Sequence, residues 1–469
     1  MLSTTHHHYT NQNNVMPTKV RRELLSFLLL ICLLLSSSSN GFIVPSRCCR
    51  NNGRITAASN MLILTERLNR FNGKRSSMVD RWRMILQSTN SNGSDDAEEE
   101  TDANTSSSSF NSNKKKSIAI VGSGAVGCYY GARLWECKDY DVHFFMRGEH
   151  YDTCKTDGLE VKSVYGDIII PPEQLNIHSS TEEMGQVDWV ILALKSTALD
   201  AAPSLLLPLL KPSTRIIAIM NGLFEDELVK MLDLEYQKIS GSSTTSNHDD
   251  GGGDDDGTTL TCCSAIYGGM ALLCSNRIAP GKIDHSYAGK LTVGIAASSS
   301  PKAEVEERHK RAIVNLWSPV TDKVEFVYTP SITRGRWTKN VWNLPFNGVS
   351  VAMGGITIEE IVQDEGLRRL ADIVMDETIS VANADLKARG EDIFGYLGDA
   401  EKKEMWNLSD NMGPYKTSTM LDLKNRKPME VKYLFRKAVD RANHLNVPVP
   451  HLETLVMQIE AFQRFHSLY

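Results

Sequence analysis

The stretch "SIAIVGSGAVGCYYGARLWE", residues 117–136, constrains the fold more than any other part of this 469-residue chain. Its first five residues, "SIAIV", form a continuous apolar run that is typical of a buried strand. The glycine-rich turn "GSGAVG" follows at once, and a helical pattern begins within it. A strand, a G-x-G-x-x-G turn and a helix in this order predict a βαβ unit that binds a dinucleotide at the turn.

Each glycine of this turn has an expected role. Gly122 allows a tight turn, Gly124 lets the backbone approach a pyrophosphate, and Gly127 allows close packing of the helix on the strand. The positive end of the helix then faces the phosphates. A plain glycine-rich turn is the weaker alternative, because strand, spacing and helix agree. The remaining residues expected to contact the cofactor here are Ser123, Ala125 and Val126.

Further apolar runs, "DVHFFM", "VDWVILAL" and "TRIIAIM", alternate with helical patterns such as "ALDAAPSLLLPLL". This alternation is the signature of βαβ units on a parallel sheet. We therefore predict an α/β Rossmann-type parallel-sheet domain that binds a dinucleotide, over residues 115–330.

After about residue 330 the strand patterns stop, so residues 331–469 are predicted to form an all-α substrate-binding and catalytic domain. Three segments carry helical patterns: "IEEIVQDEGLRRLADIVMDETISVANADLKARG", "VKYLFRKAVDRANHLN" and "LETLVMQIEAFQRF". The first of them places five apolar residues on one helical stripe, namely Ile361, Leu367, Leu370, Ile373 and Val374.

A polar tract, "SGSSTTSNHDDGGGDDDGTT", interrupts the first domain. It cannot bury enough apolar area to offset its ordering entropy, so we expect a disordered surface insertion over about residues 235–260. Its five Asp also raise a Ca²⁺-binding interpretation, but they lack any recognisable loop spacing.

The first 114 residues read as a targeting presequence. "KVRR" followed by about 12 apolar residues predicts a signal peptide over residues 1–41, because a spanning helix needs about 20. Residues 42–114 read as a transit-like segment and an acidic disordered linker, and "GFIVPSR" loosely resembles the junction motif of algal secondary plastids. The prediction is a plastid location, with secretion or retention in the endoplasmic reticulum as the alternative.

Composition favours a globular protein with a small-molecule ligand. The chain is 41% hydrophobic with a net charge of −6, which gives no reason to expect nucleic acid or an anionic membrane as partner. Its nine cysteines include no C-x-x-C pair, and no His cluster has metal-ligand spacing, so we predict no metal site and no disulfide framework.

Polar residues follow three of the predicted strands, where open parallel sheets bind ligands. Arg147 follows the second strand and suits the 2′-phosphate of NADP(H), although nearby Glu149 leaves NAD open. Lys195 closes "VILALK" and Asn221 closes "IIAIMN", so both are expected to point toward the cofactor. Each residue taken singly could instead be an ordinary surface or turn residue.

The stretch "WTKNVWNLPFNG" places Lys339, Asn343 and Asn347 at every fourth position, on one helical face. An alternative makes Lys339 a snorkelling surface residue and Asn347 a C-cap before glycine. Pro345 should remove a hydrogen bond to Val341 and kink the helix, which weakens the prediction for Asn347 most.

These motifs together resemble those of ketopantoate reductases, the 2-dehydropantoate 2-reductases, over roughly three quarters of the chain. The resemblance rests on "GSGAVG", on a basic residue after the second strand, on Lys195 and Asn221, and on "WTKNVWNLPFN". It also rests on "STMLDLKNRKPME", which spaces Ser418, Asp422 and Glu430 as the family does.

The resemblance implies NADPH-dependent reduction of 2-dehydropantoate to (R)-pantoate in pantothenate and coenzyme A biosynthesis. Lys339 takes the place of the general acid, kept protonated by a carboxylate such as Glu430, which is the second catalytic residue. The implied substrate-binding residues are Asn221, Asn343, Asn347 and Ser418.

This chain departs from the family pattern at Tyr415, where an Asn is usual, and at Phe435 and Arg436, where "NG" is common. The substrate is therefore left open between ketopantoate and another 2-oxo acid, and a non-catalytic NADP(H)-binding redox sensor is the alternative of another class. The sequence leaves the oligomeric state open, a homodimer included.

Overall fold

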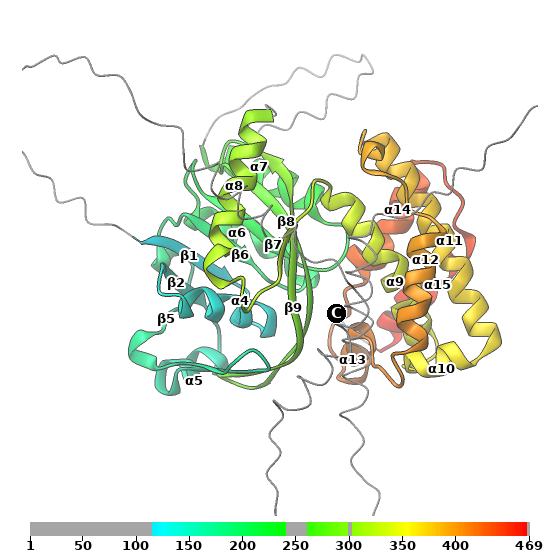
Figure 1. The fold of residues 1–469 in the computed structure, drawn as a ribbon, viewed down its shortest axis with the longest axis horizontal. Helices are drawn as coiled ribbons and strands as arrows, with labels where there is room; N and C mark the ends of the chain where they lie inside the picture. The colour runs from blue at the N-terminus through cyan, green and yellow to red at the C-terminus, as the bar shows by residue number, and fades with distance from the viewer. Residues whose placement is uncertain (1–114, 241–259, 299–302, 467–469) are drawn as a thin grey trace, which may run out of the picture. The chain divides into compact units, whose positions relative to one another are not determined.

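The computed structural model describes residues 115–240, 260–298 and 303–466. The predicted signal peptide, transit-like segment and acidic linker lie outside these ranges, as do residues 241–259 of the predicted insertion. Within the described part the chain forms a sheet domain followed by a helical domain, which confirms the predicted fold class (Figure 1).

One ten-stranded sheet organises the first domain, in the order β4-β3-β9-β8-β7-β6-β1-β2-β5, with β10 paired to β9. The run from β5 to β8 is parallel throughout, as the sequence predicts, whereas β8–β9 and β3–β4 are antiparallel. Figure 1 shows β8 and β9 as two long curved strands in green. The strands are β1 (Lys116–Val121), β2 (Tyr140–Phe145), β3 (Leu159–Ser163), β4 (Ile168–Ile170), β5 (Asn176–His178), β6 (Trp189–Leu192), β7 (Arg215–Ile219), β8 (Ala265–Ala279), β9 (Lys282–Ser298) and β10 (Phe326–Tyr328).

Helix α4 (Ala125–Glu136) packs unusually close to β1 and β2 because glycines line its sheet-facing side. A Cβ on Gly131 would lie 2.6 Å from the ring of Phe144 and 2.9 Å from the Ile120 side chain. Ile118 and Ile120 of β1 are fully buried beneath this helix. Such burial explains why "SIAIV" reads as a continuous apolar run, since both faces of β1 are covered.

Two predicted boundaries in this domain need correction. The segment "ALDAAPSLLLPLL" is not one helix: it breaks into 3₁₀ turns around the short helix α6 (Ala202–Leu206), because Pro203 and Pro208 lack the amide hydrogens that a continuous helix needs. The insertion predicted from about residue 235 starts later, since α7 (Glu225–Ser240) remains helical through Ser240. The domain is completed by α5 (Glu149–Asp157) and α8 (Ala303–Trp317).

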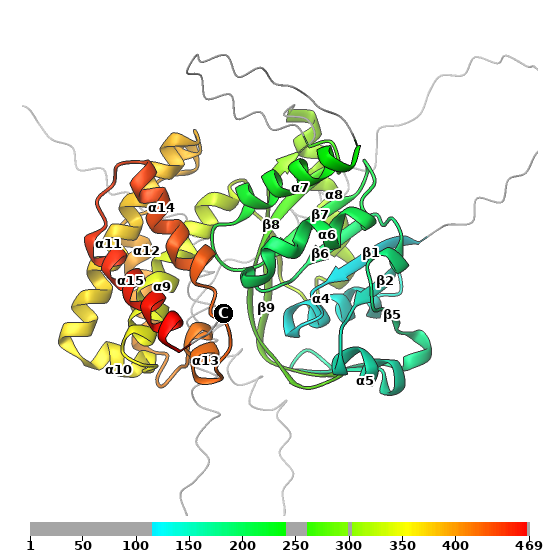
Figure 2. The same ribbon diagram turned by 180° about the vertical axis from the view of Figure 1, so that it is seen from behind.

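The second domain, which Figure 2 shows from behind, is all-α within the described residues and has its own apolar core. The predicted helix from residue 358 is divided at Asp364, whose carboxylate caps the second part by accepting from the Leu367 amide. The helices are α9 (Ile332–Ala352), α10 (Ile358–Gln363), α11 (Glu365–Ala388), α12 (Asp399–Asp410), α13 (Ser418–Lys424), a π-helical turn (Lys432–Arg436), α14 (Lys437–His444) and α15 (Pro450–Phe465).

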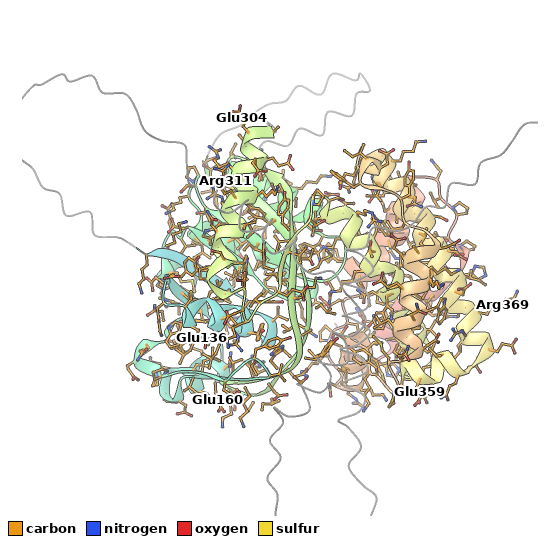
Figure 3. All side chains as sticks on the ribbon, in the orientation of Figure 1. Glu136, Glu160, Glu304, Arg311, Glu359 and Arg369 are labelled. Atoms are coloured by element: carbon orange, nitrogen blue, oxygen red, sulfur yellow. The ribbon has the colours of Figure 1, made fainter. Side chains whose placement is uncertain are left out.

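Charged side chains cover the outer surfaces of both domains. Figure 3 labels several of them, and Glu304, Arg311 and Arg369 are exposed and project away from the ribbon. None of the helices in the described ranges combines the length and apolar character that a bilayer span requires.

Candidate active site

The carboxyl ends of β1, β2, β6 and β7 form the edge at which the predicted cofactor residues meet. β1 has β2 on one side and β6 on the other, so the strand order reverses at β1. In open α/β sheets such a reversal opens a crevice for ligands. The glycine turn after β1 is tied to both neighbours, because the Ser123 hydroxyl donates to Phe145 O at 2.7 Å and the Ala193 amide donates to Val121 O at 2.8 Å.

The glycine turn has the shape that a pyrophosphate requires. Gly122 has φ +103°, and a Cβ there would lie 2.6 Å from the Ala193 carbonyl carbon. At Gly127 a Cβ would lie 2.3 Å from Gly122 O. Gly124 differs, since a Cβ there would meet no heavy atom within 4 Å, so its outer side is open to a ligand. Ala125 and Val126 begin α4, where backbone amides lack helical partners and can bind phosphate.

Arg147, which the sequence predicts to bind a 2′-phosphate, lies beyond the carboxyl end of β2. It comes two residues after the strand, is exposed, and its guanidinium carbon lies 5.6 Å from the centre of the Phe145 ring. Glu149, which keeps NAD open, is the first residue of α5 and is also exposed. The glycine turn and this exposed cation thus lie at the same edge of the sheet, and the contact of Arg147 with the cofactor stays a prediction.

Lys339 lies on α9, half-buried, and points back toward the sheet domain. Its Nζ donates to Asn221 Oδ1 at 2.9 Å and to the Ala271 carbonyl of β8 at 3.2 Å. An ammonium group has three hydrogens, so one donor remains for a ligand oxygen. Lys339 is therefore not the snorkelling surface residue of the alternative interpretation.

Asn221 joins Lys339 to Glu430 and so brings together three predicted residues from distant parts of the chain. Its Nδ2 donates to Glu430 Oε2 at 3.4 Å while its Oδ1 accepts from Lys339. The other Glu430 oxygen accepts from the Ser196 amide at 2.8 Å. Glu430 is buried, with 9% of its surface exposed, so it is not an ordinary solvent-exposed carboxylate.

The pKa of Lys339 is lowered from its usual value to about 8. Burial is the main cause, because it penalises the ammonium form, and the positive charge of Arg336 adds to it. Glu430 acts in the opposite direction, as the sequence predicts, but burial outweighs it. A lysine with a pKa near 8 is still protonated at neutral pH and is a stronger acid than a solvated one.

Lys195 and Ser418 lie at a second contact between the domains. Lys195 Nζ pairs with Asp422 Oδ1 at 2.5 Å, joining the end of β6 to α13. Ser418 is exposed at the first turn of α13, one turn before Asp422 and therefore on the same helical face. Its hydroxyl has no hydrogen-bond partner among the described residues, which leaves it free for a ligand.

The two amides on α9 contact each other. Asn347 Nδ2 donates to Asn343 Oδ1 at 3.4 Å, and Asn347 Oδ1 accepts from the Thr419 amide at 3.3 Å. Asn347 is not a C-cap, because α9 continues past Pro345 to Ala352. Both ends of its amide have protein partners, so it links α9 to α13 and orients Asn343. Its direct contact with substrate stays a prediction.

The residues that depart from the family pattern fall into two groups. Phe435 is fully buried in the helical core, and Arg436 pairs with Glu460 of α15 at 2.6 and 2.7 Å, so neither touches the Lys339–Asn221–Glu430 network. Tyr415 is 40% exposed, and its ring centre lies 6.4 Å from that of Trp342, which precedes Asn343 on α9.

The sequence did not predict the buried ion pair that lies beside this network. Arg336, three residues before Lys339, is 2% exposed and donates to Glu225 at 2.8 Å. The tract "NGLFED" shows that the acidic residue Glu225 follows the predicted Asn-Gly turn. Sequence spacing alone could not show that Glu225 pairs with Arg336.

A separate hollow of about 390 Å³ lies at the opposite edge of the sheet, where β1 and β2 begin, and is lined by residues such as Lys115 and Trp135. It contains none of the predicted site residues. Within the described ranges no group of three His, Cys, Asp or Glu side chains is arranged to hold a metal ion.

Comparisons with known proteins agree with this geometry. The family model "Ketopantoate reductase PanE/ApbA" matches residues 118–298, and "Ketopantoate reductase PanE/ApbA C terminal" matches residues 331–463. A 2-dehydropantoate 2-reductase of Nostoc sp. is 28% identical over 347 residues, covering 74% of this chain and 95% of the relative.

Solved structures give the same result. The 2-dehydropantoate 2-reductase of Geobacter metallireducens matches with a TM-score of 0.59 at 28% identity, covering 74% of this chain and 99% of that one. A D-mandelate dehydrogenase solved with NADH and anilino(oxo)acetate shares the fold, with a TM-score of 0.57 at 17% identity over 75% of this chain and all of that one. The two family models together span most of the described residues, so the chain belongs to the ketopantoate reductase family and is an oxidoreductase that acts on CH–OH groups.

Proposed function

We propose that this chain reduces 2-dehydropantoate to (R)-pantoate with NADPH, with Lys339 as the general acid, in pantothenate and coenzyme A biosynthesis. The observation that carries the proposal is the hydrogen-bonded network of Lys339, Asn221 and Glu430. It joins α9, the turn after β7 and the chain two residues before the π-helical turn. The family membership supports the same reaction class.

Bound NADPH supplies the hydride that adds to the ketone carbon. The ketone oxygen then gains negative charge and needs both a proton and a nearby cation. Lys339 provides both, because its remaining N–H points away from Asn221 and Ala271 and can reach a substrate oxygen. Asn221 and Ala271 O hold the ammonium group in place, and Glu430 favours its protonated form.

The substrate's carboxylate and hydroxyl need partners that add no charge. Asn343 and the free Ser418 hydroxyl are such partners, and α13 presents Ser418 on the face that also carries Asp422. For the cofactor, exposed Arg147 supports a preference for the 2′-phosphate of NADPH over NADH.

A steady-state assay of the purified full-length chain tests this function. We expect NADPH oxidation that depends on ketopantoate and yields pantoate, with little oxidation of NADH. Tight NADPH binding without turnover of ketopantoate or of any branched 2-oxo acid would exclude the proposed reaction.

One observation favours a second candidate, a reductase for another 2-oxo acid. Tyr415 replaces the usual Asn and its ring lies near Trp342, so the wall beside Asn343 is more aromatic than the family pattern implies. A panel of 2-oxo acids that differ in side-chain size separates the candidates. A higher kcat/KM for an aromatic 2-oxo acid than for ketopantoate would favour the second.

We also propose that the presequence directs the protein to a plastid. The support is the composition of residues 1–114, which combines a short apolar run with a segment poor in acidic residues. Imaging of a fluorescent fusion to residues 1–114 tests this location. Accumulation in the endoplasmic reticulum or in the medium would contradict it.

A further inference from the structure

Arg336 is a buried charged residue beside the site, and the proposed mechanism does not use it. Its side chain is 2% exposed and packs with its guanidinium carbon 4.8 Å from the centre of the Phe224 ring. Its Nε and Nη2 lie 2.8 and 2.7 Å from the same Glu225 oxygen, and Nη1 donates to Met220 O at 2.5 Å.

These contacts enclose the turn that carries Asn221. Met220 immediately precedes Asn221 and Glu225 begins α7, so one guanidinium binds the chain on both sides of residues 221–224. Arg336 also lies one turn before Lys339 on α9, and Lys339 donates to Asn221. Helix α9 therefore contacts this turn twice, through Arg336 at Met220 and through Lys339 at Asn221.

The neighbouring strand is shaped to admit this pair. A Cβ on Gly268 of β8 would lie 2.5 Å from Glu225 Oε1 and 2.5 Å from the side chain of Ile332. Only a glycine at this position leaves room for the carboxylate beneath α9. The Arg336–Glu225 pair is thus built into the contact between β8, α7 and α9, and is not an incidental surface contact.

We propose that Arg336 and Glu225 are positioning residues, which hold the Asn221 turn against α9 so that Asn221 and Lys339 keep the geometry that proton donation needs. This inference rests on the proposed function, since it assigns these residues a task in the same reaction. Neither residue is expected to touch substrate or cofactor.

The pair also acts on Lys339 electrostatically. Arg336 on α9 lowers the pKa of Lys339, and Glu430, just before the π-helical turn, raises it. Glu225 of α7 compensates the charge of Arg336, and Asp422 of α13 compensates that of Lys195. Removal of the Arg336 charge should therefore raise the pKa of Lys339, whereas removal of the Glu225 charge should lower it further.

Two single substitutions in the full-length chain test the inference, R336M and E225Q. The first readout is the alkaline limb of the pH profile of kcat. The second is a direct titration of Lys339 by NMR of the ¹³C-dimethylated protein, with K339M identifying the signal. This second readout needs no turnover, so it remains informative if the chain reduces none of the substrates assayed.

We expect kcat to fall roughly 10- to 100-fold in both variants, because small misplacements at a reacting centre have effects of this size. The Lys339 titration should move to higher pH in R336M and to lower pH in E225Q. R336K keeps the positive charge but loses the planar guanidinium that contacts both Glu225 and Met220. The titration of Lys339 in this variant should stay near that of wild type while kcat falls.

A variant with an unpaired buried charge can fail to fold, so the double substitution R336M/E225Q completes the set. It leaves no unpaired charge, and we expect it to fold with kcat still reduced. K238M is the matched control, since Lys238 lies in the last turn of α7, is largely exposed and pairs with the exposed Glu235 of the same helix. It should leave kcat and the titration unchanged.

Shifts of Lys339 in the same direction for R336M and E225Q would overturn the inference, as would a normal kcat in the double variant. Opposite shifts in a chain that reduces no 2-oxo acid would instead refute the proposed function. The two failures are therefore distinguishable.

Discussion

At the scale of single residues, Lys339 balances two requirements. A general acid has to be protonated in the resting enzyme and acidic enough to give up its proton, so a pKa near the working pH is best. Burial brings the pKa of Lys339 to about 8, and Glu430 limits the decrease. The same residue in solvent would keep its ordinary, higher pKa and would be a weaker acid.

Substitution of Lys339 by Met should lower kcat by about 10²- to 10⁴-fold, the usual contribution of a general acid. In wild type, kcat should fall as the pH rises through about 8, because Lys339 then loses the proton that it donates. This limb should be absent from the variant. The dissociation constant of NADPH, measured by fluorescence, should change little.

K310M is a suitable control for this variant, because Lys310 is a partly exposed lysine of α8 whose contacts are with Glu307 and the ring of Tyr328, none of them site residues. It should behave as wild type. A kcat for K339M within about tenfold of the wild-type value would rule out Lys339 as the proton donor.

Arg147 should determine the preference between the two nicotinamide cofactors. Substitution by Ala removes a charge-assisted hydrogen bond worth about 1.5–3 kcal/mol, so KM for NADPH should rise about 10- to 100-fold. KM for NADH should stay the same, since NADH has no 2′-phosphate. R311Q, which changes an exposed arginine on α8, is the control. An equal rise in KM for both cofactors would show that Arg147 does not bind the 2′-phosphate.

At the scale of elements, the turn between β7 and α7 is held from two sides. Arg336 of α9 binds it at Met220 and Glu225, and the π-helical turn binds it where the Leu223 amide donates to Tyr433 O at 2.9 Å. Gly222 makes this second approach feasible, because it has φ +92° and its Cα lies against the Tyr433 carbonyl. The sequence pair Asn-Gly thus encodes one ligand-facing amide and one close backbone contact.

Gly222→Ala should therefore harm both folding and catalysis. A Cβ would lie 2.4 Å from Tyr433 O, and the positive φ adds strain, so we expect unfolding free energy to fall by roughly 2 kcal/mol or more. The displaced Asn221 should also lower kcat. Chemical denaturation measures the first effect and the NADPH assay the second.

Gly185→Ala separates the two causes. Gly185 also has a positive φ, +65°, but a Cβ there would meet no heavy atom within 4 Å. It should cost only the backbone strain and leave kcat intact. Equal losses of stability and activity for Gly222→Ala and Gly185→Ala would show that the contact with Tyr433 contributes to neither.

At the scale of the whole molecule, local patterns predicted what local physics determines. Apolar runs predicted β1, β2, β6 and β7, and the glycine spacing predicted α4 at its observed bounds. The short edge strands and the curved β8–β9 hairpin were not predicted, because their pairing depends on neighbours distant in the sequence. Likewise, the sequence motifs identified Lys339, Asn221 and Glu430 as site residues. The role of Arg336 and Glu225 depends on a contact between residues that are 111 positions apart in the sequence.

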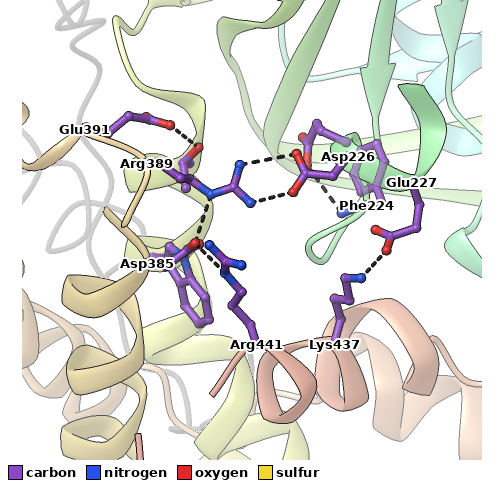
Figure 4. Close-up of polar contacts among 11 residues, drawn as sticks. Phe224, Asp226, Glu227, Asp385, Arg389, Glu391, Lys437 and Arg441 are labelled. Carbon is purple, nitrogen blue, oxygen red and sulfur yellow. Dashed lines mark hydrogen bonds and ion pairs between the residues drawn. The ribbon is translucent and has the colours of Figure 1, made fainter. Parts of the chain in front are cut away.

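The acidic run Glu225–Asp226–Glu227 illustrates such long-range information. Each of its three residues pairs with a different helix of the second domain: Arg336 of α9, Arg389 after α11 and Lys437 of α14. Figure 4 shows the last two pairs, together with Asp385, which contacts both Arg389 and Arg441. The N-terminus of α7 therefore anchors the sheet domain to three helices at once, and carboxylates are also favoured at this end of a helix.

Asp385 is the buried centre of this network, and its loss should affect the stability of the helical domain more than that of any exposed charge. It is 2% exposed and accepts from Trp337 Nε1 at 2.7 Å, Arg389 Nε at 2.9 Å and Arg441 Nε at 2.6 Å. Asp385→Asn removes the negative charge beside two arginines, and breaking such a buried pair typically costs about 3–5 kcal/mol.

The measurement is the free energy of unfolding from urea titration, with Asp376→Asn as the matched control. Asp376 lies on the same helix, but its side chain is 61% exposed and its ion-pair partner among the described residues is Lys402, so its loss should cost less than about 1 kcal/mol. Because Arg389 also binds Asp226, Asp385→Asn should loosen the anchor of α7 and raise hydrogen exchange at the amides of its first turns. Similar stabilities for the two variants would mean that the anchor at α7 depends on apolar packing and not on this carboxylate.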